Sequence, residues 1–158
     1  MPKSISKLII SIIVCQFAGI IGSLFTISSI SNWYNTLNQP SFRPPNSAFG
    51  PVWTILYTLM GISMYWIWMK IPKNKKAKEV FKLFLLHLII NSAWSIVFFG
   101  FHQIFLALIV IIILWFMIVS IMKKMLLIDS RASGILFPYL LWVSFATVLN
   151  YSIWMLNR

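Results

Sequence analysis

The chain is 158 residues long, with 60% hydrophobic and only 9% charged residues. A soluble domain carries about a quarter charged residues, so this composition excludes an ordinary water-soluble fold. Thirteen Lys and Arg residues against two acids give a net charge of +11. That charge would suit nucleic acid, but the cations only interrupt long apolar runs and form no face of their own, so we expect no nucleic-acid partner.

Five apolar runs follow one another, at residues 8–30, 49–69, 81–101, 103–122 and 134–156. Each has about the 20 residues that a helix needs to cross a bilayer, and a chain in lipid must pair its own backbone groups. We therefore predict an all-α membrane protein, a single domain over residues 1–158 that is a bundle of five transmembrane helices. Pro138 lies inside the fifth run and should kink that helix.

The cations indicate the orientation of the bundle. Because successive helices alternate in direction, the N-terminus and the second and fourth connections share one side. That side carries eleven cations: Lys3, Lys7, Lys70, Lys73, Lys75, Lys76, Lys78, Lys82, Lys123, Lys124 and Arg131. The other side has Arg43 and Arg158. An excess of Lys and Arg marks the cytoplasmic side, so we expect a cytoplasmic N-terminus and an outside C-terminus.

The first connection, residues 31–48, is 18 residues long and differs from the others. Loops of this length are commonly functional or disordered. Its three prolines stiffen it, and Trp33, Tyr34, Leu37 and Phe42 give it apolar surface to bury. A disordered linker would lack such aromatics. We expect this connection to fold back as a lid over the outer end of the bundle.

Conventional catalytic chemistry has little support in this sequence. Cys15, His87 and His102 are too few and too scattered for a zinc site, so we expect no metal and no required cofactor. His87, Asn91 and Trp94 fall on one face of the third helix. We interpret His87 as a residue that bridges helices. Asn91 has two interpretations, a bridge between helices or a ligand contact, and the sequence leaves both open.

Aromatic residues also gather on faces of the second and fifth helices. The spacing of four aligns Phe49, Trp53 and Tyr57. In the fifth helix, Trp142 lies on one face with Ala146 and with Leu149 or Asn150. Tryptophans at the membrane interface are usual, but Trp53 and Trp142 coincide with the polar faces. We therefore expect a tall aromatic cavity under the lid, suited to a large planar apolar ligand.

Three stretches carry a resemblance to a known family. They read Trp33-Tyr34-x-x-Leu37-x-x-Pro40-x-x-x-Pro44-Pro45-x-x-x-Phe49-x-x-x-Trp53-x-x-x-Tyr57-x-x-x-Gly61, then Asn91-x-x-Trp94-Ser95-x-x-Phe98-Phe99, and Pro138-Tyr139-Leu140-x-Trp142-x-x-Phe145-Ala146-x-x-Leu149-Asn150. The sequence resembles the translocator protein family, also called tryptophan-rich sensory protein or peripheral-type benzodiazepine receptor. The resemblance covers all five apolar runs.

The resemblance to a bacterial member implies a multi-pass protein of the bacterial cytoplasmic membrane that forms a homodimer among the membrane lipids. It implies a pocket for porphyrins such as protoporphyrin or haem, for sterols and for benzodiazepine-type ligands. Matched residue by residue, the pocket contains Tyr34, Pro44, Phe49, Trp53, Tyr57, Asn91, Trp94, Trp142, Ala146 and Leu149. We add Arg43, the only cation of residues 31–48, as the partner of the acidic groups of a porphyrin.

The sequence leaves three functions open. The favoured one is a membrane binder or sensor of porphyrins. The second is a light-dependent porphyrin-degrading enzyme, in which the resemblance gives Trp53 and Trp142 the catalytic role of electron donors. The third is a passive transporter of porphyrins or sterols. Sterol recognition departs from the family pattern, because Met155 stands where animal members have arginine.

Overall fold

The computed structural model describes residues 3–158, and over this range it is helical with no strand. The long helices are α1 (Lys3–Asn32), α2 (Phe49–Lys70), α3 (Lys75–Ser95), α4 (Ile104–Leu126) and α6 (Phe137–Leu156), with a short α5 (Ser130–Gly134) before the last. Five segments are long and apolar enough to cross a membrane, which confirms the predicted fold class. Residues 1 and 2 and the side chain of Lys3, which the predicted domain and the charge count include, lie outside the described part.

The third helix begins at Lys75, six residues before the predicted start of the span. The side chain of Asn74 accepts a hydrogen bond of 2.9 Å from the backbone nitrogen of Lys76 and so caps the helix. Ala77 and Val80 in the added turns are buried. The prediction marked only the apolar part, whereas the capped helix continues into the lysine-rich segment.

The fifth span consists of two helices with an interruption before Pro138, whereas the sequence predicted one continuous helix with a kink. Helix α5 ends at Gly134 and α6 starts at Phe137. Pro138 stands in the first turn of α6, where its missing backbone N–H removes no helical hydrogen bond. Asp129 caps α5 through a bond of 3.1 Å from the backbone nitrogen of Arg131, and a further bond from the Arg131 side chain holds the pKa of Asp129 below its usual value.

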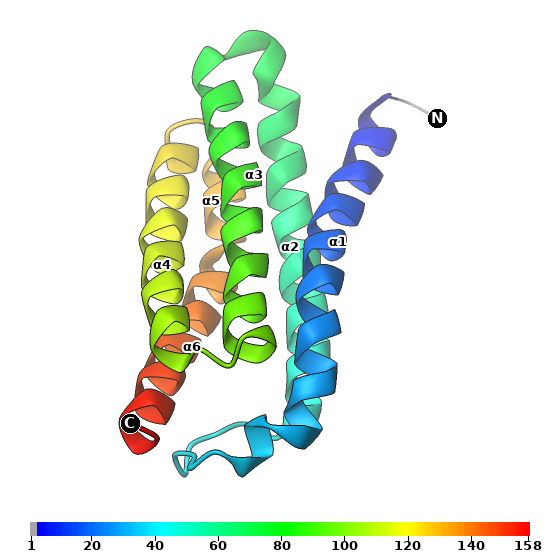
Figure 1. The fold of residues 1–158 in the computed structure, drawn as a ribbon. Coiled ribbons are helices and arrows are strands. Elements are labelled where there is room, and N and C mark those ends of the chain that lie inside the picture. Colours follow the sequence, from blue (N-terminus) through cyan, green and yellow to red (C-terminus); the bar gives the residue numbers. More distant parts are fainter. Residues whose placement is uncertain (1–2) are drawn as a thin grey trace.

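The helices form a bundle in which α1 packs along α2 and α3, while α4 packs along α3 and α6 (Figure 1). Helices α2 and α6 contact each other much less. Helix α1 begins at one end of the bundle and α6 ends at the other, as five spans require (Figure 1). The connection between α1 and α2 lies at the same end of the bundle as the C-terminus (Figure 1).

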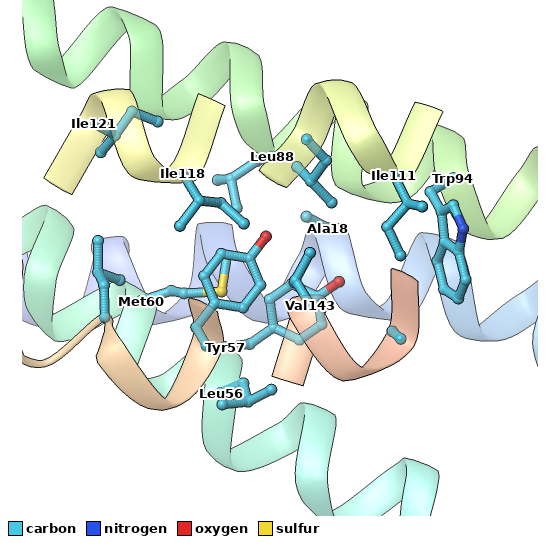
Figure 2. Close-up of a cluster of buried hydrophobic side chains, with 14 of the residues drawn as sticks. Ala18, Leu56, Tyr57, Met60, Leu88, Trp94, Ile111, Ile118, Ile121 and Val143 are labelled. Carbon is cyan, nitrogen blue, oxygen red and sulfur yellow. The ribbon is translucent and has the colours of Figure 1, made fainter. Parts of the chain in front are cut away.

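Buried apolar side chains from all the long helices meet inside the bundle. Figure 2 shows Ala18 of α1, Met60 of α2, Leu88 of α3, Ile111 of α4 and Val143 of α6 in this cluster. In lipid, such packing stabilises the bundle through van der Waals contact rather than through burial from water. Residues 31–48 lie at the C-terminal end of the bundle, and Trp94 of this cluster also lines the cavity described below (Figures 1 and 2).

Candidate ligand-binding site

The predicted aromatic residues meet in an inner cavity between α2, α3 and α6. Its wall contains seven of the residues expected from the sequence: Tyr34, Phe49, Trp53, Trp94, Trp142, Ala146 and Leu149. The cavity has a volume of only about 20 Å³. That space holds about one water molecule, so the tall cavity expected from the sequence is almost closed in this structure.

The rings of the cavity wall fill the space by packing edge to face. Trp53 and Trp142 have centroids 6.4 Å apart and planes at 87°. Phe49 meets Trp142 at 6.3 Å and 77°, and Trp53 stacks on Tyr57 at 5.4 Å and 28°. Aromatic pairs prefer such arrangements to face-to-face stacking. The two tryptophan rings thus fill much of the space between α2 and α6 at the cavity.

Asn91 is not part of the wall of the inner cavity and instead lies in a buried hydrogen-bonded chain across three helices. Tyr57 donates to its Oδ1 at 2.6 Å, and its Nδ2 donates to the Tyr139 hydroxyl at 2.7 Å. His87 Nδ1 lies 2.8 Å from the carbonyl of Phe84, which can only accept, so this nitrogen carries the proton. His87 Nε2 therefore accepts from Tyr139 at 3.1 Å. The helix-bridging role of His87 is confirmed, and Asn91 bridges helices as well.

Residues 31–48 cover the cavity, as predicted. Tyr34 is only 2% exposed. The backbone nitrogen of Asn38 donates to Asn157 Oδ1 at 2.9 Å, and Asn157 Nδ2 donates to the Asn38 carbonyl at 2.8 Å, which ties the connection to the end of α6. Phe42 lies against Phe145 of α6 with centroids 6.2 Å apart. We call residues 31–48 the lid from here on.

Two predicted site residues belong to the lid rather than to the cavity wall. The guanidinium of Arg43 donates to Gln39 Oε1 at 2.6 Å and lies 5.8 Å from the centre of the Tyr34 ring. Pro44 is half-buried and lines neither of the cavities next to the aromatic rings. Arg43 therefore braces the lid internally, through contacts with two other residues of the same segment.

Sequence reasoning missed several residues of the wall. Phe98 and Phe99 are neighbours in the chain, yet both are buried, because residues Ile96–Gly100 form a π-helical turn. Trp94 donates from its indole nitrogen to Asn150 Oδ1 at 3.1 Å. The helical spacing after Trp142 and Ala146 offered Asn150 as an alternative to Leu149, and both residues line the cavity. The π-turn left no signal that periodicity could detect.

A second, larger hollow opens between α1 and α2 toward the outside of the bundle. It has a volume of about 280 Å³ and we call it the α1–α2 groove. Its wall includes Gln16, Gly19, Ser23, Thr26, Gly50, Thr54 and Tyr57. It shares Phe49, Trp53, Trp94 and Phe99 with the inner cavity. The same aromatic side chains therefore separate the groove from the inner cavity.

The sequence profile of the TspO/MBR family matches residues 11–155, almost the whole chain. This chain belongs to the TspO/MBR family. It is 39% identical over 157 residues to the tryptophan-rich protein TspO of Chlorobaculum tepidum, with 99% of both chains covered. It is 39% identical to the TspO protein of Archaeoglobus fulgidus over 98% of this chain and 99% of that one. It is 33% identical to the human translocator protein over 87% of this chain and 82% of the relative.

Membership of the TspO/MBR family and the five apolar helices make this a multi-pass membrane protein. In the described part of this TspO/MBR chain, no three His, Cys, Asp or Glu side chains lie close enough to hold a metal ion. The wall of the inner cavity contains indole, phenol and amide groups beside apolar side chains.

Proposed function

We propose that this protein binds porphyrins and similar planar apolar molecules inside the bundle. The observation that carries the proposal is the inner cavity, in which four large aromatic rings from α2, α3 and α6 surround one small space under the lid. Stacking on indole faces suits a flat conjugated ligand. The site has no charged side chain in its wall, so it favours an apolar ring over a charged one.

Binding of such a ligand requires the cavity to open. Ligand sites have volumes of about 300–1,000 Å³, far above the 20 Å³ of the closed cavity. Helices α2 and α6 contact each other little, so widening that side of the bundle breaks little helix packing. Trp53 and Trp142 meet across this side, so separating their rings would create a slot between two indoles.

The orientation and assembly of the protein complete this proposal. With the N-terminus in the cytoplasm, as the cation count indicates, the lid faces outward and the porphyrin comes from the outer side. We propose the bacterial cytoplasmic membrane as the location and a homodimer as the assembly, on the resemblance to bacterial members.

A titration with protoporphyrin tests the proposal. Adding protoporphyrin to the purified protein should quench its tryptophan fluorescence, and the quenching should saturate. Ala146→Phe puts a ring into the inner cavity, where Ala146 is 9% exposed, and should weaken binding about tenfold or more. Val148→Phe, on the lipid-facing side of the same helix at 55% exposure, should leave the affinity unchanged. Equal affinities for both variants, or no saturable binding by the unmodified protein, would contradict the proposal.

One observation favours a second function, the light-dependent degradation of the bound porphyrin. Trp53 and Trp142 lie 6.4 Å apart in the cavity wall, and a porphyrin bound between them would touch both. An excited porphyrin would take one electron from an indole and become a radical anion, leaving an indole radical cation. Illumination with protoporphyrin should bleach its absorbance more slowly in Trp53→Phe than in Trp115→Phe. Trp115 bonds to Ser144 on another side of the bundle, and equal bleaching would exclude Trp53 as the donor.

A further inference from the structure

The α1–α2 groove differs from an ordinary lipid-facing seam in its polar wall. Polar side chains at membrane depth commonly face a bundle interior or mark a ligand path. Ser23, Thr26 and Thr54 line the groove and donate to carbonyls of their own helices at 2.8, 3.0 and 2.9 Å. Their hydroxyl oxygens can still accept a hydrogen bond. The groove thus suits an amphipath that has a flat apolar body and a polar edge.

The groove is confined to the half of the bundle near the lid, because the other half is tightly closed. A Cβ at Gly61 would lie 2.6 Å from the Cα of Ile12, so α1 and α2 touch there by their backbones. Gln16 Nε2 then donates to the Thr54 carbonyl and to Thr58 Oγ1, both at 3.0 Å. The seam between α1 and α2 is fixed up to Gln16.

Beyond Gln16 the hydrogen bonds of α1 go to a different part of the bundle. Ser92 of α3 donates to the Ala18 carbonyl at 2.9 Å, and Ser29 lies 2.9 Å from His102 Nε2 in the α3–α4 turn. Over residues 3–158, no side-chain hydrogen bond joins α1 to α2 on the lid side of Gln16. The α1–α2 seam can therefore open there without breaking a polar contact.

The lid end of the inner cavity is closed by side-chain hydrogen bonds, which this part of the seam lacks. The lid is tied to α6 by two hydrogen bonds between Asn38 and Asn157. Within the lid, Arg43 contacts Gln39 and the Tyr34 ring. From the groove, only the rings shared by both spaces stand between a ligand and the inner cavity. A ligand dissolved in lipid reaches these rings without opening the lid.

We propose that the α1–α2 groove is a binding site in its own right, where an amphipath from the lid-side leaflet docks before it passes Phe49 and Trp53 into the inner cavity. The inference rests on the proposed porphyrin-binding function and adds the source of the ligand and its route. Because the groove lies on the path but outside the final site, blocking it slows binding and release by the same factor. The equilibrium affinity then stays unchanged.

Two glycines provide a matched test. A Cβ at Gly50 or at Gly134 meets no atom within 4 Å, and neither residue has a positive φ, so a side chain can start from either position without a clash at Cβ or backbone strain. Gly50 lines the groove, whereas Gly134 ends α5 and lies apart from both cavities. Gly50→Leu plugs the groove and Gly134→Leu is the control. Ser23→Leu plugs it from α1 if Gly50→Leu fails to fold.

The probe is protoporphyrin dimethyl ester delivered in lipid vesicles to the protein in vesicles, followed by stopped-flow fluorescence. Gly50→Leu should lower the association and dissociation rate constants together, by about tenfold, with the Kd unchanged and Gly134→Leu normal. Unchanged rates in Gly50→Leu and Ser23→Leu would overturn the route. Faster release with a weaker Kd would also overturn it, because the groove would then be part of the final site. If the unmodified protein binds no ester, the proposed function itself fails, whatever the variants do.

Discussion

Replacing Tyr139 by Phe removes one hydroxyl from the centre of the buried chain of hydrogen bonds. Tyr139 is fully buried, and its hydroxyl accepts from Asn91 and donates to His87. Phe keeps the ring that packs edge-on to Trp53 at 6.4 Å, so the packing is largely preserved. The substitution leaves two buried polar atoms, Asn91 Nδ2 and His87 Nε2, without the hydroxyl that they bond.

The magnitude follows from these two groups. An orphaned buried polar group costs about 1–3 kcal/mol, whereas a side-chain hydrogen bond between transmembrane helices contributes about 0.6 kcal/mol on average. Water cannot reach His87, which is 1% exposed, or Asn91, which is 2% exposed, so neither finds a substitute partner. We expect the free energy of unfolding to fall by about 2–4 kcal/mol, between two average bonds and two orphaned groups. Tyr57→Phe orphans only Asn91 Oδ1 and should cost about half as much.

The assay is reversible unfolding in mixed micelles with increasing dodecyl sulfate, followed by circular dichroism. The matched control is Tyr151→Phe, the same substitution on the same helix at a residue that is 49% exposed. The control should change the free energy of unfolding by less than about 0.5 kcal/mol. If Tyr139→Phe destabilises the protein no more than Tyr151→Phe does, the buried chain is not a structural element and the reasoning fails.

Three further predictions concern topology and the lid. Cysteines introduced at Lys75 and Arg158 should react with an impermeant maleimide from opposite sides, Arg158 in intact cells and Lys75 only after permeabilisation; the reverse pattern would place the lid in the cytoplasm. Replacing Pro44 and Pro45 with Gly should raise the release rate of protoporphyrin more than it lowers the association rate. An unchanged residence time would show that the lid only connects α1 to α2 and does not retain the ligand. Arg43→Ala should weaken protoporphyrin more than its dimethyl ester, with a difference that shrinks as salt rises. Equal losses for acid and ester would show that Arg43 acts only by holding the lid.

The sequence by itself determined the number of spans, the family and the face of each helix that carries aromatic residues. These properties are local, because 20 apolar residues require a helix in lipid and the spacing of Phe49, Trp53 and Tyr57 puts them on one side. The aromatic content of residues 31–48 also sufficed to predict a lid, since such residues must find apolar surface to cover. The break at Pro138 was only half predicted, because the sequence marks a lost hydrogen bond but not whether the helix bends or restarts.

Only the tertiary structure decided which faces meet and how much space they leave. Helical spacing placed Asn91 on one face with His87 and Trp94. Its hydrogen-bond partners, Tyr57 and Tyr139, depend on how α2 and α6 are positioned around α3. The closing of the inner cavity to about 20 Å³ and the opening of a groove of about 280 Å³ beside it have no signature in the sequence. A void is what remains after side chains from several helices have packed, so its size depends on differences of a few ångströms between helices that periodicity does not encode.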